Sequence, residues 1–556
     1  MKKLILLVFG ALAVNVYVYG QVLTQRHSFT RADTLRGMLS PLRSCYDINY
    51  YHLDIKVDIG RRFISGSNLF QFTANSDFSR LQFDLFKNLL VEKVVYKGKE
   101  LKFTREYDAV FVDFEETIKQ GSKEQFTVYY SGRPVVAKNP PWDGGFIFTH
   151  DSAKKPWVAV TCQGLGASSW WPNKDHQSDE VDSMLISIAV PEGLTNVSNG
   201  RLRSSERLTD GYTRFNWFVS YPINNYNVTL NIADFAHFSD VYSGEKGSLD
   251  LDYYVLKENL QKAKPHFDAD VKRMLSCFEH WFGPYPFYHD GYKLVEAPYL
   301  GMEHQSAVAY GNQYKKGYSG KDLSGTGLGL SWDYLIIHET GHEWFGNNIT
   351  SKDIADMWIH EAFTTYSEGL FVECNEGKQK GAEYIKGERK AVLNDTPVIG
   401  TYNVNKEGSG DMYFKGTNML HTIRSIVNDD ETWRKTLRGL NSTFGLKTVT
   451  SDEIIAYVNQ STGKDLNKVF EQYLNYTSIP TLEIKKGKGG KASLNYRWKS
   501  EVKGFNMPLK VRFLPSNDGD WFFIQPSADW KSLTLPEGKK SLEADTDNFF
   551  IETSQK

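Results

Sequence analysis

Cysteine is scarce in this sequence: its 556 residues include 4 cysteines, at positions 45, 162, 277 and 374. No two of them form a Cys-x-x-Cys pair, so a zinc-ribbon framework is excluded. A chain of this length can bury large hydrophobic cores and does not need disulfide bonds for its stability. Disulfides and buried free thiols are therefore both compatible with the sequence.

An excess of charge of one sign is also missing. Lysine and arginine together number 65, aspartate and glutamate 67, and the formal net charge is −2. Proteins that bind nucleic acid carry basic patches or stripes, so this balance argues against a nucleic-acid partner. Long hydrophobic runs are absent beyond the N-terminus, because no later stretch of about 18 apolar residues predicts a membrane span.

The first 20 residues have the pattern of a secretory signal peptide. Two lysines precede an apolar run that ends near Val14, and the small residue Gly20 follows. This order predicts cleavage after Gly20 and export of the mature chain, to the periplasm or the medium. The alternative is an uncleaved membrane anchor, which the short apolar run and Asn15 disfavour.

Three domains follow in the pattern of apolar residues. Residues 21–240 predict antiparallel β structure, because apolar and polar residues alternate, as over 51–59 and again over 226–232. Residues 241–478 show the helical spacing of a mainly α domain. Alternation returns in residues 479–556, which suffice for a small β-sandwich. The predicted fold is therefore multi-domain, with a mainly α domain between two β domains.

The stretch "HETGHEWFG" (338–346) carries the strongest chemical pattern. Residues four apart on a helix lie on one face, one turn apart, so His338 and His342 can both bind one Zn²⁺. Glu339 would then lie beside the open coordination position, where a general base is needed. The alternative is a chance match, in which two histidines share a helix face without a metal.

A catalytic zinc site with two histidines needs a third protein ligand. Glu361 follows His342 after 18 intervening residues, at the start of a second apolar-rich helix, "MWIHEAFTTYSEGLFVE" (357–373). The first helix can end near Asn347, and the second can return a carboxylate to the two histidines. The sequence therefore predicts one Zn²⁺ per chain, held by His338, His342 and Glu361.

With this spacing the sequence resembles the gluzincin aminopeptidases, the family of aminopeptidase N and leukotriene hydrolase. The stretches "HEWFGN" and "WIHEAFTTYSEG" are similar to that family's motifs, and "SSWWPNKDHQSDEVDSMLISIAVPEGLTNVSNG" (168–200) resembles its N-terminal domain. The resemblance covers most of the mature chain. It implies a thermolysin-like catalytic domain and hydrolysis of peptides with a free N-terminus. Many members carry a helical fourth domain, and because no segment is left for one here, the active site is expected to be more open or to be closed by another protomer.

The resemblance also assigns roles to residues that spacing alone cannot single out. "YFKG" (413–416) is similar to the family's Tyr-x-Lys-Gly, whose tyrosine donates to the oxyanion, so that role maps to Tyr413. "YLGMEH" (299–304) is similar to Gly-x-Met-Glu-Asn, which implies that Gly301, Met302 and Glu303 bind substrate. Glu303 would hold the substrate's α-amine.

Two residues of this stretch depart from the family pattern. Leu300 replaces a glycine whose backbone holds the substrate, and His304 replaces an asparagine. A protonated His304 would place a positive charge beside the amine site, so activity is expected to fall as the pH drops through about 6.5. Gln163 and Tyr299 match family positions that line the first substrate pocket.

The sequence thus predicts an exported zinc aminopeptidase. Two alternatives stay open: a zinc peptidase whose specificity is altered by Leu300 and His304, and an inactive relative that only binds peptides. The presence of both histidines, the base and Tyr413 disfavours the second. The oligomeric state and the preferred N-terminal side chain are not predicted.

Overall fold

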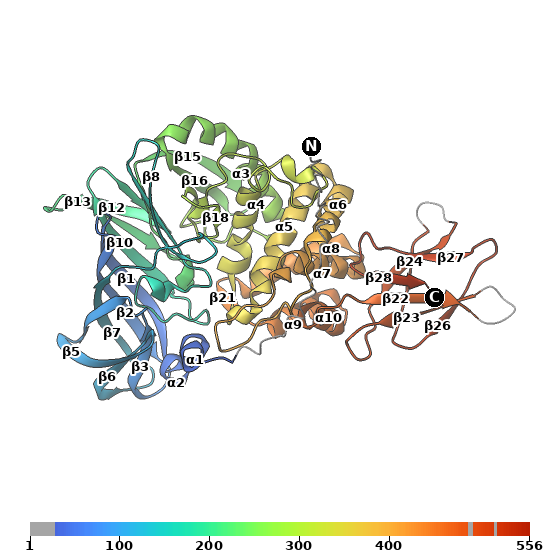
Figure 1. The fold of residues 1–556 in the computed structure, drawn as a ribbon, viewed down its shortest axis with the longest axis horizontal. Coiled ribbons are helices and arrows are strands. Elements are labelled where there is room, and N and C mark those ends of the chain that lie inside the picture. The colour runs from blue at the N-terminus through green and yellow to red at the C-terminus, as the bar shows by residue number, and fades with distance from the viewer. Residues whose placement is uncertain (1–27, 488–492, 516–519, 556) are drawn as a thin grey trace, which may run out of the picture.

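The computed structural model describes residues 28–487, 493–515 and 520–555. The predicted signal peptide lies outside these residues. Within them the chain forms a β domain, a mainly helical domain and a small β domain, placed in that order along the molecule (Figure 1). The predicted fold class is confirmed. No helix in the described ranges combines the length and the apolar character that a membrane span requires.

The N-terminal domain consists of two sheets. In the larger one, β1 and β10 run parallel and every other neighbouring pair is antiparallel. Its strands, in spatial order, are β12 (Arg201–Arg207), β13 (Tyr212–Val219), β10 (Ser183–Pro191), β1 (Tyr46–Asp58), β2 (Phe63–Ala74), β7 (Lys123–Gly132), β4 (Leu89–Tyr96), β5 (Lys99–Glu106), β6 (Ala109–Ile118) and β3 (Phe78–Asp84). The smaller sheet contains β11 (Thr195–Val197), β14 (Asn231–Ala233), β9 (Pro156–Thr161) and β8 (Gly145–His150). Two short helices, α1 (Arg31–Gly37) and α2 (Pro41–Ser44), precede the first strand.

The alternation at 51–59 is confirmed by β1, whose inward side chains are buried. The prediction of a strand over 226–232 is wrong for most of that segment. Residues 225–227 form a 3₁₀ turn, and pairing begins only at β14. Asn227 and Thr229, the polar residues of this pattern, are as buried as Val228 and Leu230. The segment is therefore enclosed on all sides, and an alternating pattern does not mark a solvent-facing strand here.

The helical domain begins with a five-stranded sheet, which lies at its boundary with the N-terminal domain. The strand order is β15 (Phe235–Gly244), β16 (Gly247–Leu256), β17 (Tyr292–Glu296), β19 (Val308–Tyr310) and β18 (Gly301–Met302). The helices are α3 (Leu260–Phe282), α4 (Tyr334–Gly341), α5 (Trp358–Glu376), α6 (Lys378–Glu388), α7 (Phe414–Val427), α8 (Asp430–Phe444), α9 (Ser451–Thr462) and α10 (Asn467–Asn475). A parallel pair, β20 (Ile349–Ser351) and β21 (Lys447–Val449), joins two loops of this domain.

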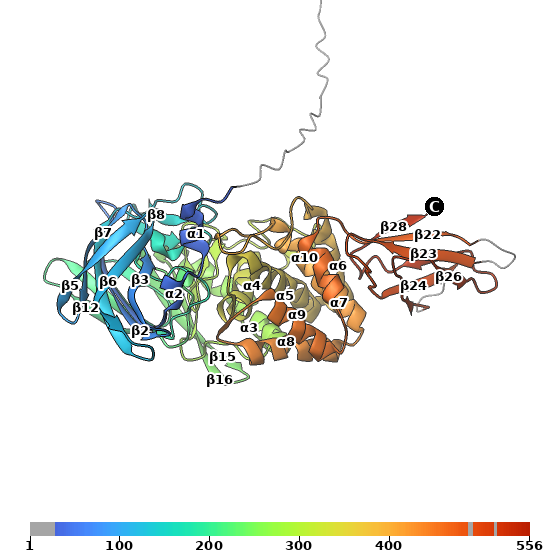
Figure 2. The same ribbon diagram turned by 90° about the horizontal axis from the view of Figure 1, so that it is seen from below.

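The predicted boundary at residue 240 falls inside β15, and the boundary at 478 falls between α10 and β22 (Thr481–Lys486). The C-terminal domain projects away from the rest of the molecule and packs two small sheets together (Figures 1 and 2). One sheet contains β26 (Lys531–Thr534), β23 (Ser493–Lys499), β22 and β28 (Glu552–Gln555). The other contains β25 (Phe522–Ile524), β24 (Leu509–Leu514) and β27 (Ser541–Ala544).

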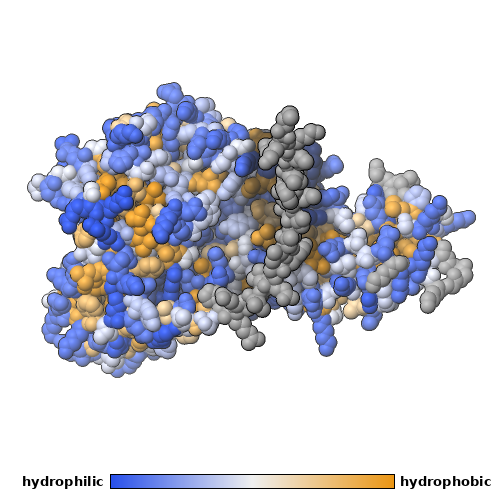
Figure 3. All heavy atoms as spheres, in the orientation of Figure 1, coloured by the Kyte–Doolittle hydropathy of each residue, from blue (hydrophilic) through white to orange (hydrophobic). Residues whose placement is uncertain are grey.

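The hydrophobic cores show how the domains are joined. One core runs from the helical domain into the C-terminal sheets. The other fills the N-terminal domain and includes Val295, Tyr299 and Met302, which belong to the helical domain's sheet and the segment before β18. The β18 edge of that sheet is therefore anchored in the N-terminal domain. Figure 3 shows that hydrophobic residues gather on the N-terminal domain in that view, among mainly hydrophilic neighbours.

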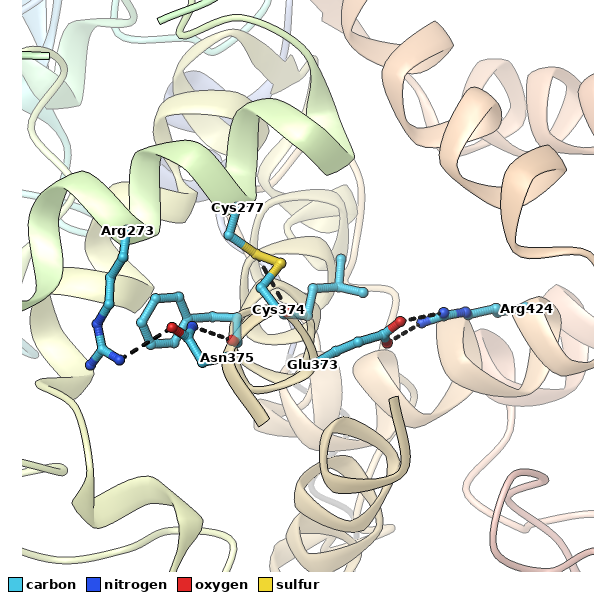
Figure 4. Close-up of a disulfide and its surroundings, with 8 residues drawn as sticks. Arg273, Cys277, Glu373, Cys374, Asn375 and Arg424 are labelled. Carbon is cyan, nitrogen blue, oxygen red and sulfur yellow. Dashed lines mark hydrogen bonds and ion pairs between the residues drawn. A yellow bond between two sulfur atoms is a disulfide. The ribbon is translucent and has the colours of Figure 1, made fainter. Parts of the chain in front are cut away.

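A disulfide bond joins Cys277 on α3 to Cys374 on α5 (Figure 4). Glu373, next to it, forms a two-bond ion pair with Arg424 of α7 at 2.7 and 2.8 Å. The disulfide and the ion pair tie three helices of the domain together near one end of α5. Cys45 and Cys162 are buried free thiols, so both possibilities that the sequence left open occur in this chain.

Candidate active site

The helix α4 presents the first part of the site. All its residues, from Tyr334 to Gly341, are buried, so its polar side chains face protein rather than bulk water. Asp333 caps its N-terminus by accepting a hydrogen bond from the Leu335 amide at 3.0 Å. The helix ends at His342, and Gly346, with a φ of +126°, lets the chain turn away directly afterwards. His338, Glu339 and His342 are thereby fixed on one rigid turn of helix.

The helix α5 brings Glu361 to the two histidines. Its Oε2 atom lies 3.7 Å from Nε2 of His338 and 3.4 Å from Nε2 of His342. Zinc bonds of about 2.0–2.1 Å in a tetrahedral arrangement hold neighbouring ligand atoms about 3.3 Å apart. The Oε2 atom is buried and has no hydrogen-bond partner within the described residues. The three donors therefore fit one zinc ion by type, spacing and free lone pair.

The Nδ1 atom of each histidine, on the side of the ring away from Glu361, contacts a hydrogen-bond acceptor. Nδ1 of His338 lies 2.7 Å from Oε1 of Glu368, and Nδ1 of His342 lies 3.1 Å from the Phe345 carbonyl oxygen. Both acceptors require a proton on Nδ1, which leaves Nε2 free to bind a metal. This tautomer and orientation are what a zinc-binding histidine needs.

Glu368 is a site residue that the sequence reading missed. It follows Glu361 by seven residues on α5, which is two helical turns, so both carboxylates lie on the same face. Its second oxygen accepts a hydrogen bond from the Tyr384 hydroxyl at 2.7 Å. Burial, and then the charge of Glu368, raise the pKa of the neighbouring Glu388 well above its usual range.

Glu339 lies at the substrate side of the histidines. Burial, opposed by the nearby His338, raises its pKa to about 7. A general base works best when its pKa is near the working pH. The neighbouring strand leaves no spare room, because a Cβ atom on Gly301 would lie 2.8 Å from Oε1 of Glu339. The glycine at this position thus allows β18 to run directly beside the base.

Glu303 is buried in the same place. Donor atoms of Glu303, Glu339 and His342 lie within 4.8 Å of one another. The Gln163 amide donates to Oε1 of Glu303 at 2.7 Å, and Asn347 fixes the backbone carbonyl of Glu303 at 2.8 Å. Burial raises the pKa of Glu303, because the ionised carboxylate is removed from water there. A ligand's ammonium group would supply a positive partner.

The remaining predicted residues surround this centre. The ring of Tyr413 stacks against that of His338, with ring centroids 6.0 Å apart. Burial, and then the charge of Glu361, raise the pKa of Tyr413 well above its usual range. Met302 is buried beside Glu303, and the hydroxyl of Tyr299 donates to the Val160 carbonyl at 3.4 Å. The structure thus brings all ten predicted residues together, while their individual roles stay predictions.

His304 differs from the sequence expectation. Its side chain is fully buried, and neither ring nitrogen has a hydrogen-bond partner in the described ranges. Burial lowers its pKa to about 3. The predicted protonation near pH 6.5 is therefore wrong: the imidazole stays neutral at any pH at which a peptidase would be assayed. Leu300 is partly exposed and lines a groove described below.

Two family models match the chain. The "Peptidase M1 N-terminal domain" matches residues 47–226, and the "Peptidase family M1 domain" matches residues 267–473, which include every metal-binding candidate. Together these matches cover the β domain and most of the helical domain.

Curated relatives are distant and longer. Tricorn protease-interacting factor F2 of Thermoplasma volcanium is 21% identical over 59% of this chain and 42% of its own length. Endoplasmic reticulum aminopeptidase 1 of Homo sapiens is 24% identical over 42% of this chain and 26% of its own. Aminopeptidase N of Lactobacillus helveticus is 25% identical over 44% of this chain and 31% of its own length. The chain therefore spans less than half the length of these three relatives.

Solved structures of similar length share the fold. A two-domain M1 zinc metallopeptidase bound to L-tryptophan matches with a TM-score of 0.66 and 20% identity, covering 78% of this chain and 95% of that one. An M1 zinc metallopeptidase from Deinococcus radiodurans, bound to a Tyr-Ser-Ala substrate, matches with the same TM-score and identity over 79% and 96%.

Proposed function

Because the chain belongs to the M1 peptidase family, whose members named above include aminopeptidases, we propose that it is an exported zinc aminopeptidase that removes single N-terminal residues from peptides. The observation that carries the proposal is the closeness of Glu303 to Glu339 and His342, within 4.8 Å. A carboxylate that binds the substrate's α-amine at this position leaves space for one residue before the cleaved bond.

His338, His342 and Glu361 would hold the zinc ion, which when bound lowers the pKa of a water ligand to about 7 and polarises a carbonyl group. Glu339 accepts the proton released from the attacking water and returns it to the departing amine. Tyr413 donates a hydrogen bond to the oxygen that becomes negative as the peptide carbonyl is attacked. Glu303, held by Gln163, binds the ammonium group and so fixes the register of the peptide.

Export rests on the N-terminal pattern and is supported by the disulfide between Cys277 and Cys374. Structural disulfides persist mainly in oxidising compartments such as the periplasm and the extracellular space. Fractionation of cells that express the full chain, followed by N-terminal sequencing, tests this. A mature protein that begins at Gln21 in the exported fraction is expected.

The specificity is tested with paired substrates. An amino-acyl anilide with a free amine and its acetylated form differ only in the charge that Glu303 would bind. We expect rapid hydrolysis of the first, little of the second, and loss of activity with a zinc chelator. Equal rates on both would favour the alternative of a zinc peptidase with altered specificity, for which Leu300 in place of the family's glycine is the motivating observation.

A further inference from the structure

A groove of about 660 Å³ opens between the N-terminal domain and the sheet of the helical domain. Strand β8 and the loop before it form one wall, and residues 296–300 with the loop after β19 form the other. Figure 1 shows β8 and β18 in the region where these two domains meet. The groove belongs to neither the metal ligands nor the pocket around Gln163.

The groove reaches the active site through its own wall. Tyr299 and Leu300 line it, and the next residue, Gly301, is the one that lies against Glu339. On the same wall, in the loop after β19, the ring of Tyr318 packs 5.2 Å from that of Tyr334, which in turn stacks 5.2 Å from His338. The groove therefore begins about one residue length from the catalytic centre.

The backbone of β18 sets the direction in which a peptide would leave the centre. The strand lies at the edge of its sheet, paired with β19 on one side only in the part of the chain that the structure describes. Such an edge can pair with an extended peptide. With the peptide's amine at Glu303, its chain would run antiparallel to β18, so that its second residue passes Gly301 and its third reaches Leu300.

The lining of the groove favours a cationic occupant. Asp151, Glu258 and Glu296 contribute carboxylates, and no lysine or arginine lines it among the described residues. The nearby Lys155 and Lys257 both bind Asp234, outside the groove. Glu296 accepts hydrogen bonds from three donors. Glu258 is exposed and accepts a hydrogen bond from the Ser152 amide at 3.3 Å.

An exposed tryptophan completes the groove. Trp142 has 64% of its surface accessible to solvent although it lines a concave region. An indole face beside carboxylates binds guanidinium and ammonium groups by cation–π contact.

We propose that this groove, between β8 and the segment preceding β18, binds the third and following residues of peptide substrates and selects basic side chains there. The inference rests on the proposed aminopeptidase function and adds to it a preference for cationic peptides. Glu258 and Trp142 are the specificity-determining residues, and neither touches the bond that is cleaved.

The test uses tetrapeptides that share their first, second and fourth residues and carry Arg, Ala or Glu at the third. A single charge pair or cation–π contact of this exposed kind changes kcat/KM by about two- to fivefold. We expect the order Arg, Ala, Glu for the wild-type protein. Glu258→Gln keeps the acceptor for Ser152 and should reduce the Arg-to-Ala ratio towards one, and Glu258→Lys should invert it.

Two controls separate this inference from the proposed function. Hydrolysis of an amino-acyl anilide, which has no third residue, should be unchanged in the Glu258 and Trp142→Ala variants. The matched variant Glu116→Gln, at an exposed glutamate of β6, should keep the wild-type ratio. Tryptophan fluorescence can measure the binding of the same tetrapeptides to zinc-loaded Glu339→Gln protein, which does not turn them over. The affinities should follow the same order: Arg, Ala, Glu.

Equal kcat/KM and equal affinity for the three tetrapeptides, with normal anilide hydrolysis, would overturn the role proposed for the groove. The proposed aminopeptidase function would remain. A protein that contains zinc but cleaves neither the anilide nor any tetrapeptide would overturn the proposed function and this inference with it. A preference for Arg that survives in both Glu258→Gln and Trp142→Ala would also overturn the assignment to this groove.

Discussion

Oε1 of Glu368 lies 2.7 Å from Nδ1 of His338, on the side of the imidazole that faces away from the candidate metal position. The same carboxylate accepts a hydrogen bond from the Tyr384 hydroxyl. Two buried residues, Glu368 on α5 and Tyr384 on α6, therefore hold the orientation of one histidine on α4.

This arrangement predicts that Glu368 controls zinc affinity. Loss of a group that positions a metal ligand typically costs about 10–100-fold in metal affinity. Glu368→Ala should show a loss of this size, and Glu368→Gln a smaller one, because its amide oxygen can still accept from His338. Titration with a competing chelator measures both. Equal zinc affinity in Glu368→Ala and the wild-type protein would show that Glu368 is only a packing residue.

Replacement of Glu339 by glutamine keeps the size of the side chain but removes its ability to accept a proton. We expect at least about 10²-fold lower turnover with full zinc content. Metal analysis and thermal unfolding of the same sample confirm that site and fold are intact. Turnover close to that of the wild-type protein would place the base elsewhere.

Tyr413→Phe removes one hydrogen-bond donor and almost no volume. Loss of one oxyanion donor typically lowers kcat by about 10²–10³. Steady-state kinetics on an amino-acyl anilide separates the two possible roles. A change confined to KM would make Tyr413 a residue that binds substrate rather than one that stabilises developing charge.

Glu303→Ala would leave a buried ammonium group of the substrate without its partner. Removing one member of such a pair costs about 2–5 kcal/mol, or roughly 30- to 5,000-fold in kcat/KM. The loss should affect peptides with free N-termini and spare any slow cleavage of acetylated ones. If kcat/KM falls equally for free and acetylated substrates, Glu303 does not recognise the amine.

The buried histidines predict sensitivity to acid. Burial lowers the pKa of His304 and of His421 to about 3 each, against about 6.5 in an unfolded chain. Between pH 6.5 and 3 each of these two imidazoles therefore binds a proton in the unfolded state and not in the folded state, and each lowers the free energy of unfolding as the pH falls. Each imidazole contributes about 1.4 kcal/mol per pH unit within this window.

Urea unfolding of chelator-treated protein at pH 7.0 and 5.5 measures this slope without the pH dependence of metal binding. His421→Gln should flatten the slope. In the zinc-loaded enzyme, kcat/KM of His304→Asn should follow the wild-type pH profile above pH 5, because His304 is neutral throughout. A difference between the two profiles centred near pH 6.5 would restore the charged role for His304.

The residues of the site that could be predicted from the sequence are those that lie close together along the chain. His338, Glu339 and His342 share one helical turn, so their spacing alone predicted their common face. Glu368 could have been found in the same way, from its position two turns after Glu361. The metal centre was therefore predictable because two local patterns, each confined to one helix, carry it.

Contacts between distant segments could not be predicted in this way. Gln163 meets Glu303 across 140 residues, and only the likeness to a family indicated their proximity. The alternating segment at 226–232 was misread because the domain interface buries both of its faces. His304 was expected to titrate because the sequence does not show how deeply the β18 segment is enclosed.

The disulfide between Cys277 and Cys374 has a topological consequence for the site. The covalent ring that it closes spans 97 positions and contains Glu303, Glu339 and all three candidate zinc ligands. A protease that cuts the loop between β19 and α4 would therefore yield two polypeptides that stay linked. Such a nicked chain would migrate as one band without reductant and as two bands with it, and it would carry Glu303 on one fragment and Glu339 with all three candidate zinc ligands on the other.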